Sequence, residues 1–334
     1  MKSQERMKVF SEAERTRQSR FRMGLAAESW LEPDGGDSGE PAYLLPPGHE
    51  ESNLFPSLRG PGGAIDFFRE RGISWWRTSA YEDETVRDRP TRHMVSSQVS
   101  CVNFLMPLAD HPAALAALLR GIDDDVIDVL PIEHQGRTSF VELEWIGTTD
   151  PLEPDSFLRG EKRTSIDALL LARVPGGRRA YFIEWKYTES CGAESYAAGS
   201  KGATRVRRYQ EAYDRSGVFN LPFAETLVDP VYQLVRSVLL GERTVQRREL
   251  GVAEARTIVV CPKANLAYRT LPPGHPLATG EITAVEELMR RRVLREPRRF
   301  GLVSQSHLVC AVRGDGVGLP EGWLDYQAQR YGWS

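Results

Sequence analysis

A hairpin formed by two apolar segments, residues 164–174 and 178–188, constrains the fold of this chain most strongly. Both segments are rich in residue types that favour β-strands, and the Pro-Gly-Gly sequence at 175–177 favours a turn between them. Away from the turn, charged residues interrupt the two apolar segments at three positions, Asp167, Glu184 and Lys186. Because an unpaired charge is costly to bury, the hairpin predicts either a mutual ion pair or a bound metal ion.

The register of the hairpin decides whether the three charges meet. Residues two apart on a strand point to the same face, so Glu184 and Lys186 share one face. We expect a register in which Pro175 pairs with Arg178. In this register Asp167 lies opposite Lys186 and diagonal to Glu184, within about 5–8 Å. A slip of one residue would separate Asp167 from both, and the turn sequence permits the productive register without requiring it.

Two neighbouring carboxylates suit Mg²⁺, which binds proteins through one or two carboxylates, retains water molecules and takes substrate phosphate as a ligand. Mn²⁺ is an expected substitute. An adjacent lysine can hold or deprotonate the attacking water and offset negative charge on phosphorus. The Glu-x-Lys tripeptide alone is uninformative, because chance supplies it roughly 0.5 times in a chain of this composition. The same charges are also compatible with a buried salt bridge between two strands.

The hairpin resembles the motif of the PD-(D/E)xK, or restriction-endonuclease-like, nuclease superfamily. The matching pieces are Ser165-Ile166-Asp167 and Glu184-Trp185-Lys186, with Ile166 where the family has proline. The wider pattern is similar to a bacterial branch of that superfamily, over about residues 96–265. The pieces that carry this wider similarity are Ser96-Ser97-Gln98 with Asn103-Phe104, Arg163-Thr164-Ser165-Ile166-Asp167, Glu184-Trp185-Lys186-Tyr187-Thr188-Glu189 and Tyr232-Gln233-Leu234-Val235-Arg236.

The resemblance implies an α/β fold with a restriction-endonuclease-like core, in which helices flank a mixed central β-sheet. It implies Asp167 and Glu184 as Mg²⁺ ligands and Lys186 as the catalytic lysine. Members often add an upstream glutamate, for which Glu144 is the candidate and Glu142, on the same face of its strand, the rival. Both glutamates are equally compatible with an ordinary solvent-facing strand.

A helix expected at residues 198–214 supplies further candidates. Related exonuclease-like members place a polar residue beside the metal site, and we expect Gln210 there, with Gln233 equally plausible. The spacing of Gln210 to Tyr213 is one residue shorter than in those nucleases. Phosphate contacts are expected from the opposite, basic stripe of the helix, although surface charge explains the same residues: Lys201, Arg205 and Arg208.

The remaining patterns predict the elements that surround the hairpin. A helix capped by Ser96 begins the core, and three consecutive aspartates at 123–125 predict a solvated connector rather than a metal cluster. The other expected elements are a helix at 113–120, a strand at 139–146, a helix from 229 to about 241, a strand at 257–261 and a helix at 284–294.

Charge and composition indicate how the chain is organised. The 334 residues carry a net charge of −3, whereas residues 160–300 hold 24 basic and 16 acidic side chains, which favours a local surface for a polyanion. We expect residues 1–60 to form a flexible N-terminal tail and acidic loop, and 61–334 a single nuclease-like domain. No apolar run is long enough for a membrane span, no signal peptide is expected, and the scattered cysteines favour the reducing cytoplasm.

These features together predict an Mg²⁺-dependent nuclease, a hydrolase acting on phosphodiester bonds of DNA, with defence or repair suggested by analogy. The alternative is a catalytically inactive nucleic-acid-binding protein that retains the nuclease fold. Paired cleavage of duplex DNA would require a homodimer or two successive cuts, and the sequence predicts no dimer interface.

Overall fold

The computed structural model of the chain describes residues 3–25, 40–77, 80–83, 85–134, 136–148, 152–153 and 163–334. Residues 28–39 of the expected acidic loop lie outside this part. None of the helices in the described ranges is long and apolar enough to cross a membrane.

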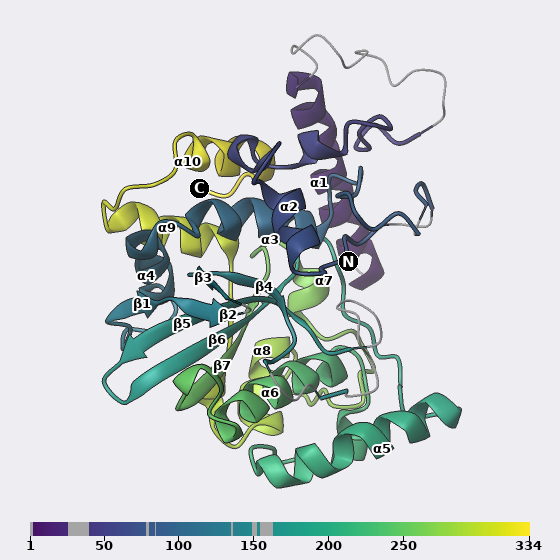
Figure 1. The fold of residues 1–334 in the computed structure, drawn as a ribbon. Coiled ribbons are helices and arrows are strands. Elements are labelled where there is room, and N and C mark those ends of the chain that lie inside the picture. Colours follow the sequence, from purple (N-terminus) through teal and green to yellow (C-terminus); the bar gives the residue numbers. More distant parts are fainter. Residues whose placement is uncertain are drawn as a thin grey trace.

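A mixed six-stranded sheet forms the centre of the molecule (Figure 1). Its strand order is β1-β5-β6-β7-β8, and β4 also pairs with β5. β5 is antiparallel to β1, β4 and β6, whereas β6, β7 and β8 are mutually parallel. The strands of this sheet are β1 (Asp128–Leu130), β4 (Glu142–Trp145), β5 (Ile166–Val174), β6 (Gly177–Trp185), β7 (Glu254–Val260) and β8 (Phe300–Val303). A separate two-stranded sheet pairs β2 (Ile132–His134) with β3 (Arg137–Ser139).

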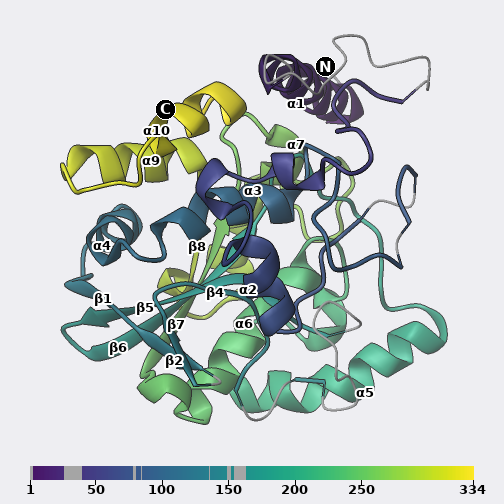
Figure 2. The same cartoon turned by 45° about the horizontal axis from the view of Figure 1, so that its top comes forward.

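Helices cover both faces of the sheet (Figures 1 and 2). Helices α3, α4 and α9 pack on one face, α6 and α8 pack on the other, and α5 lies against α6. The expected α/β architecture with a mixed central sheet flanked by helices is therefore confirmed. The helices are α1 (Ser3–Leu25), α2 (Ala64–Glu70), α3 (Ser97–Leu105), α4 (Pro112–Arg120), α5 (Gly199–Ser216), α6 (Val231–Gln246), α7 (Leu266–Arg269), α8 (Val285–Leu288), α9 (Gln305–Gly314) and α10 (Trp323–Tyr326).

Short helical turns of other types join these elements. The π-helical turns η7 (Met289–Val293) and η9 (Gln327–Tyr331) continue α8 and α10. The 3₁₀ turns are η2 (Glu50–Asn53), η3 (Pro56–Leu58), η4 (Met106–Leu108), η5 (Phe223–Thr226), η6 (Glu249–Gly251) and η8 (Pro297–Arg299).

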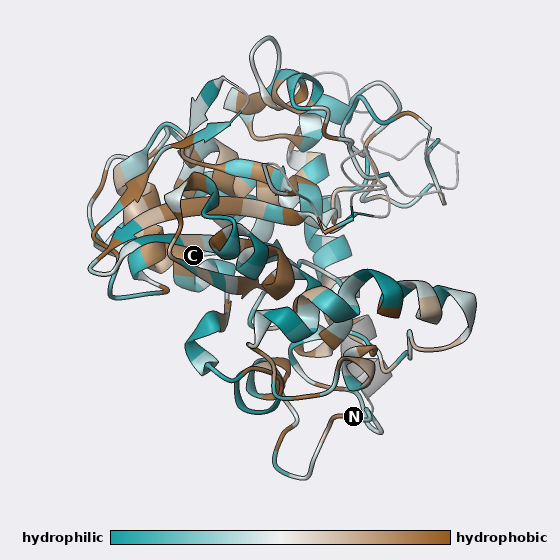
Figure 3. Cartoon of the chain, turned by 60° about the horizontal axis from the view of Figure 1, so that its bottom comes forward, coloured by the Kyte–Doolittle hydropathy of each residue, from teal (hydrophilic) through white to brown (hydrophobic). Residues whose placement is uncertain are grey.

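The apolar pattern of the hairpin explains why two helical layers form. On β5, Ala168 and Leu170 pack into the core beneath α3 and α4, whereas Leu169 and Leu171 pack towards Leu240 of α6. A strand buried on both faces reads as a continuous apolar run rather than an alternating one. Figure 3 shows these hydrophobic strands at the centre of the molecule.

The hairpin itself is present, but its register differs from the expected one by two residues. Val174 pairs with Gly177, so the turn consists of residues 175–176 and not 176–177. The backbone of Gly177 has φ of +124°, which glycine adopts without steric cost. Continuing this register along the strands places Asp167 opposite Glu184 rather than opposite Lys186. Because the difference is two residues and not one, all three side chains keep the same face.

Two helix boundaries show which sequence signals were informative. The Ser96 side chain accepts a hydrogen bond from the Val99 backbone N–H at 3.3 Å, so the predicted cap of α3 is confirmed. Helix α6 continues past Gly241 to Gln246, so the expected end near Gly241 was wrong. A Cβ at Gly241 would lie 3.1 Å from Ala255, so this glycine allows α6 to approach the sheet closely and does not end the helix.

The N-terminal segment differs from the expected tail. Gln18 of α1 is fully buried, and its amide nitrogen donates to the Tyr187 hydroxyl at 2.9 Å and the Arg330 carbonyl at 3.1 Å. The Tyr187 hydroxyl in turn donates to Glu14 at 2.7 Å. Between residues 40 and 60, four apolar side chains are also buried, namely Leu44, Leu45, Leu54 and Phe55. The packing therefore does not change at residue 60.

The three consecutive aspartates also differ from the expected connector, because one of them is buried. Asp124 and Asp125 are exposed, but Asp123 is only 7% exposed. Its carboxylate accepts a hydrogen bond from Tyr181 and pairs with Arg179 and with Arg256, the latter at 2.9 Å. A buried carboxylate needs such partners, which the local sequence does not reveal.

Candidate active site

Three carboxylates lie side by side across three adjacent strands. The pairing of the flanking residues places Glu144 of β4 opposite Asp167 of β5. Asp167 in turn lies opposite Glu184 of β6. Directly opposed residues of antiparallel strands have Cβ atoms about 4.5–5.5 Å apart. The sheet therefore gathers acidic groups that are separated by long stretches of sequence.

Glu144 has an unusual backbone conformation within its strand. Its φ of 49° lies in the left-handed region, which costs a residue other than glycine about 1–3 kcal/mol. Its carboxylate is held from two sides at 2.9 Å, by the side-chain amide of Gln98 and by the hydroxyl of Ser165. The surrounding structure thus fixes this carboxylate at a position that the backbone alone would not favour.

Glu184 and Lys186 form a hydrogen-bonded cluster with helix α6. The Lys186 ammonium donates to Glu184 Oε1 at 2.7 Å, and the Gln233 amide donates to the same oxygen at 2.7 Å. Lys186 also donates to Gln233 Oε1 at 3.3 Å, and the Ser237 hydroxyl reaches Glu184 Oε2 at 3.4 Å. Glu184 and Lys186 are 4% and 8% exposed, so their charges interact with little screening by water.

Asp167 has few compensating partners for a half-buried carboxylate. One oxygen accepts a hydrogen bond from the Trp185 backbone N–H at 2.6 Å. Burial raises the pKa of Asp167 well above its usual value, and the negative charges of Glu184 and Glu144 raise it further. For Lys186 burial acts to lower the pKa, but the surrounding acidic groups, of which Glu184 contributes most, together outweigh it and the pKa is raised. The cluster therefore favours additional positive charge.

The donor set fits a divalent cation that binds together with its substrate. Within the described ranges, no three histidine, cysteine, aspartate or glutamate side chains are arranged as a ready-made metal site. Asp167 and Glu184 nevertheless offer hard oxygen donors side by side. Mg²⁺ needs only one or two carboxylates, since water and substrate phosphate complete its shell. These two residues would hold the ion, as the resemblance implies.

A cavity of about 420 Å³ opens over these carboxylates. Its lining adds two arginines, Arg163 and Arg236, to Lys186, so cations and carboxylates are balanced in number. Arg236 donates to the Thr164 hydroxyl at 2.9 Å and is 22% exposed at its side chain. The remaining lining residues are Trp76, Ser96, Ser97, Gln98, Glu144, Thr164, Ser165, Asp167, Glu184, Trp185, Gln233 and Ser237.

Apart from Gln233, which was the alternative to Gln210, several of these residues were not predicted as part of the site. Gln233, Arg236 and Ser237 are spaced three and four residues apart on α6, so they share one face of that helix. The Tyr232–Arg236 segment belonged to the wider similarity, and this spacing was the available signal. Arg163 also belonged to the wider similarity, whereas Trp76 carried no comparable signal, because its proximity to the carboxylates depends on long-range packing.

Gln210 does not reach the carboxylates, so its expected position was wrong. The side of α5 that faces the protein runs through Tyr209 and Tyr213, which are both buried. Adjacent residues of a helix point about 100° apart, and Gln210 therefore projects away from the core. Its amide donates to both carboxylate oxygens of Asp214 at 2.9 Å. Gln233, the other residue considered, occupies the site instead.

The expected basic stripe of α5 is divided in the structure. Arg205 faces the protein, with its guanidinium 5.0 Å from the Tyr196 ring and 5.5 Å from the Tyr232 ring. Lys201 is exposed, and neither it nor Arg208 lines the carboxylate cavity. Phosphate contact by Lys201 and Arg208 stays a prediction.

Glu142, the rival of Glu144, has a structural partner. It is fully buried and forms a two-pronged ion pair with Arg71, at 3.0 and 3.1 Å. The guanidinium of Arg71 also stacks over the Phe67 ring, 3.8 Å from its centroid. These contacts explain Glu142 without a metal or a substrate.

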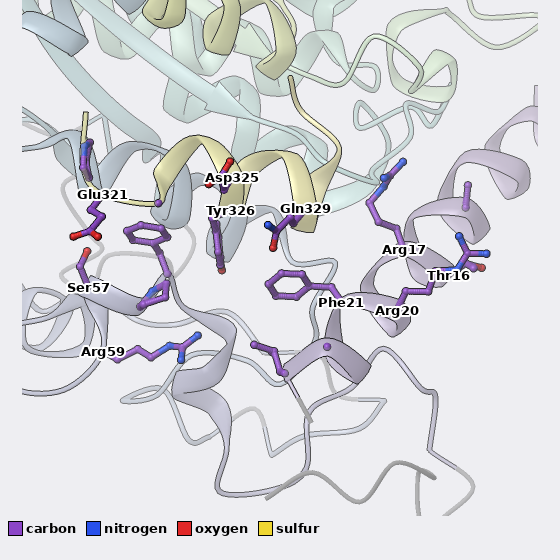
Figure 4. A pocket seen from close by; sticks show the side chains of 17 residues that line it. Thr16, Arg17, Arg20, Phe21, Ser57, Arg59, Glu321, Asp325, Tyr326 and Gln329 are labelled. Carbon is purple, nitrogen blue, oxygen red and sulfur yellow. The ribbon is translucent and has the colours of Figure 1, made fainter. Parts of the chain in front are cut away.

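A larger cavity of about 1140 Å³ lies elsewhere, between α1 and the C-terminal helices (Figure 4). Phe21 and Tyr326 project into it, with Arg17, Arg20 and Arg59 at its sides. It shares no lining residue with the carboxylate cavity. Chemistry rather than size therefore identifies the candidate active site.

Comparison with known proteins places the chain in a family. No curated protein and no solved structure matches it. A family model described as "Restriction Endonuclease associating with ARP" matches residues 69–332, which include every residue that lines the carboxylate cavity. The mixed α/β sheet is consistent with a restriction-endonuclease-like fold. The chain therefore belongs to the restriction endonuclease family that this model describes.

Proposed function

We propose that this chain is a metal-dependent nuclease that hydrolyses phosphodiester bonds of DNA. The observation that supports this most directly is the alignment of Glu144, Asp167 and Glu184 across neighbouring strands, with Lys186 hydrogen-bonded to the last of them. Such an acidic cluster in a cavity that also carries arginines suits a phosphate ester that binds together with a divalent cation.

Different residues of the site would bind the metal ion, orient the attacking water and bind the phosphate. Mg²⁺ bound at Asp167 and Glu184 would supply electrostatic stabilisation of the negative charge that develops on the phosphate oxygens. Lys186, whose ammonium is oriented by Glu184 and Gln233, would orient the attacking water and offset charge on the phosphate. Arg163 and Arg236 would bind the phosphate at the walls of the cavity.

Glu144 has a separate role in this proposal. Its carboxylate is held by Gln98 and Ser165, and it lies beside Asp167 rather than beside Lys186. We assign it to binding a water molecule of the metal shell, or the metal itself once substrate is present. A carboxylate fixed in advance in this way reduces the reorganisation that binding would otherwise require.

Cleavage assays test the proposal. Supercoiled plasmid, linear duplex, single-stranded DNA and RNA are incubated with the protein in Mg²⁺, in Mn²⁺ and in EDTA. We expect metal-dependent cleavage of DNA that Asp167→Ala and Glu184→Gln abolish, whereas Asp214→Asn on the exposed side of α5 leaves it unchanged. The absence of cleavage of every substrate, together with no calorimetric binding of Mg²⁺ or Mn²⁺, would overturn the proposal. Binding of DNA without cleavage would instead favour an inactive protein that retains the fold.

A further inference from the structure

Trp76 is an exposed tryptophan at the edge of the carboxylate cavity. Its residue surface is 56% exposed, and its side chain lines the same cavity as Asp167 and Lys186. The preceding residue, Trp75, is buried and stacks on Phe68 with ring centroids 3.8 Å apart and planes within 10°. Single exposed apolar residues are common on protein surfaces, so the exposure of Trp76 alone does not indicate a binding site.

The backbone that carries Trp76 is tied to the carboxylate cluster. The Trp76 N–H donates to Gln98 Oε1 at 2.9 Å. The amide nitrogen of the same glutamine donates to the Ser74 carbonyl at 3.2 Å and to Glu144 at 2.9 Å. One buried side chain, Gln98, therefore fixes the position of Trp76 relative to a carboxylate of the site. On the other side, the Trp75 N–H donates to the Arg87 carbonyl at 3.1 Å.

The groups around Trp76 define the chemistry of a ligand. The cavity joins an indole surface to three cations, Lys186, Arg163 and Arg236. Within the described ranges, the buried Arg163 Nε has no hydrogen-bond acceptor. A ligand that satisfies both kinds of group carries a flat ring and an anionic phosphate, as a nucleotide does. A cavity of about 420 Å³ lies towards the lower end of small-ligand sites, which span roughly 300–1,000 Å³, and suits one nucleotide.

We infer that Trp76 stacks on an unpaired base beside the scissile phosphate, and that the substrate strand enters the site single-stranded. Inside a duplex the faces of each base are covered by its neighbours, so a side chain stacks fully only on a base that is unpaired or flipped out. Aromatic stacking of this kind tolerates any base, because every base presents a π-face. This inference rests on the proposed nuclease function and adds the class of its substrate.

Equilibrium binding in EDTA tests the inference without any cleavage. The probe is a fluorescein-labelled twelve-residue oligo(dT), and the same sequence annealed to oligo(dA) provides the duplex. Because stacking contributes about 1–3 kcal/mol per base, Trp76→Ala should weaken binding of the single strand roughly 5- to 150-fold. Trp76→Phe keeps a stacking ring and should stay within about threefold of the unsubstituted protein. The affinity for the duplex should change little, and by about the same factor in Trp76→Ala and Trp76→Phe.

Two further measurements separate stacking from a change in the fold. Tyr81→Ala removes an exposed aromatic side chain that does not line the cavity, and it should leave binding of the single strand unchanged. Oligo(dT) should also quench part of the tryptophan fluorescence of the unsubstituted protein, and this quenching should be absent in Trp76→Phe. Thermal unfolding of each variant confirms that the fold is retained.

The outcomes distinguish this inference from the proposed function. If Trp76→Ala binds oligo(dT) as tightly as the unsubstituted protein, or loses the same factor for duplex DNA, the inference is wrong even where Asp167→Ala abolishes cleavage. If Trp76→Ala selectively loses the single strand while no metal-dependent cleavage is found with any substrate, the stacking site stands and the nuclease proposal fails.

Discussion

Strand β6 carries buried charges at both of its ends, and the two ends differ in how these charges are compensated. Near its start, Arg179 and Tyr181 contact Asp123, which also pairs with Arg256. Near its end, Glu184 meets Asp167 across the hairpin. Every strong charge at the first end has an opposite partner, whereas the second end gathers carboxylates beside one another.

The pKa values of Asp123, which is buried, and Asp167, which is half-buried, express this difference. Burial acts to raise the pKa of both. At Asp123 the hydrogen bond from Tyr181 and the charge of Arg256, together with the Asp125 backbone and Arg179, outweigh burial, and the pKa is lowered. At Asp167 the carboxylates of Glu184 and Glu144 add to burial, and the pKa is raised. One cluster stabilises the fold with its charges compensated, and the other places two further carboxylates beside Asp167, whose mutual repulsion a bound cation would relieve.

The largest expected effect is on stability, at the compensated end. Asp123→Ala leaves Arg179 and Arg256 without their shared carboxylate, and breaking a buried ion pair from one side costs about 3–5 kcal/mol. We expect a loss of that size in the free energy of unfolding, measured by urea titration. Cleavage per folded molecule should be unchanged, and Asp124→Ala, which removes the exposed neighbour, should have no measurable effect on either quantity. A stability equal to that of the unsubstituted protein would show that the two ends do not differ as described.

The opposite pattern is expected at the other end. Asp167→Asn removes one of the adjoining carboxylates, so the free energy of unfolding should not fall. Cleavage should fall on the order of 10³-fold, because electrostatic stabilisation by a bound metal contributes several kcal/mol to the barrier. Urea titration and cleavage rates, measured on the same preparation, check both statements. A substantial loss of stability would mean that Asp167 serves the fold, as Asp123 does.

A third titratable group, the half-buried His93, extends the comparison to the pH dependence of stability. Burial lowers its pKa to about 4, from an unfolded value near 6.5, and its ring packs edge-on against Tyr43 at 5.1 Å. The unfolded chain therefore binds a proton at higher pH than the folded chain. Stability is full above about pH 6.5 and declines by about 3 kcal/mol as the pH falls to 4.

Urea titrations at pH 7, 6, 5 and 4.5 measure this decline. His93→Gln should flatten the slope between pH 6.5 and 5, whereas His307→Gln on the exposed side of α9 should not change it. An identical slope in the unsubstituted protein and His93→Gln would contradict the assignment. Carboxylates such as Asp123 do not produce a slope in this range, because a lowered pKa makes stability fall only below the unfolded value of about 3.9.

The features of the fold and site that could be predicted from the sequence are those set by interactions between residues close in sequence. The period of two residues placed Asp167, Glu184 and Lys186 on one face, because alternation is a local property of a strand. The register was wrong by two residues because a Pro-Gly-Gly sequence accommodates its two-residue turn at either of two positions. The face survived this error, since only an odd slip would have changed it.

The rest of the site depends on contacts between distant segments. Gln98 reaches Glu144 across 46 positions of sequence, and Trp185 bonds Ser100 across 85. No periodicity within a single segment encodes such proximity. The same limit explains why Asp123 was expected in solvent, since its partners Arg179 and Arg256 arrive on other strands.

The smallest expected effect compares two glutamines that the sequence could not rank. Gln233 donates to Glu184 and accepts from Lys186, so it orients both groups without contacting substrate in our proposal. Loss of a residue that orients a metal ligand typically costs 10- to 100-fold in metal affinity or activity, and for Gln233→Ala we expect about 10-fold. Gln210→Ala, on the outer side of α5, should stay within about twofold, as surface substitutions generally do.

A merely structural role for Gln233 would lower stability and leave the affinity for Mg²⁺ intact, so calorimetric titration with Mg²⁺ separates the two roles. Gln233→Glu provides the complementary test, because it keeps the acceptor for Lys186 but places a second carboxylate against Glu184. If both glutamine-to-alanine variants cleave DNA equally well, the hydrogen bonds from α6 do not position the site.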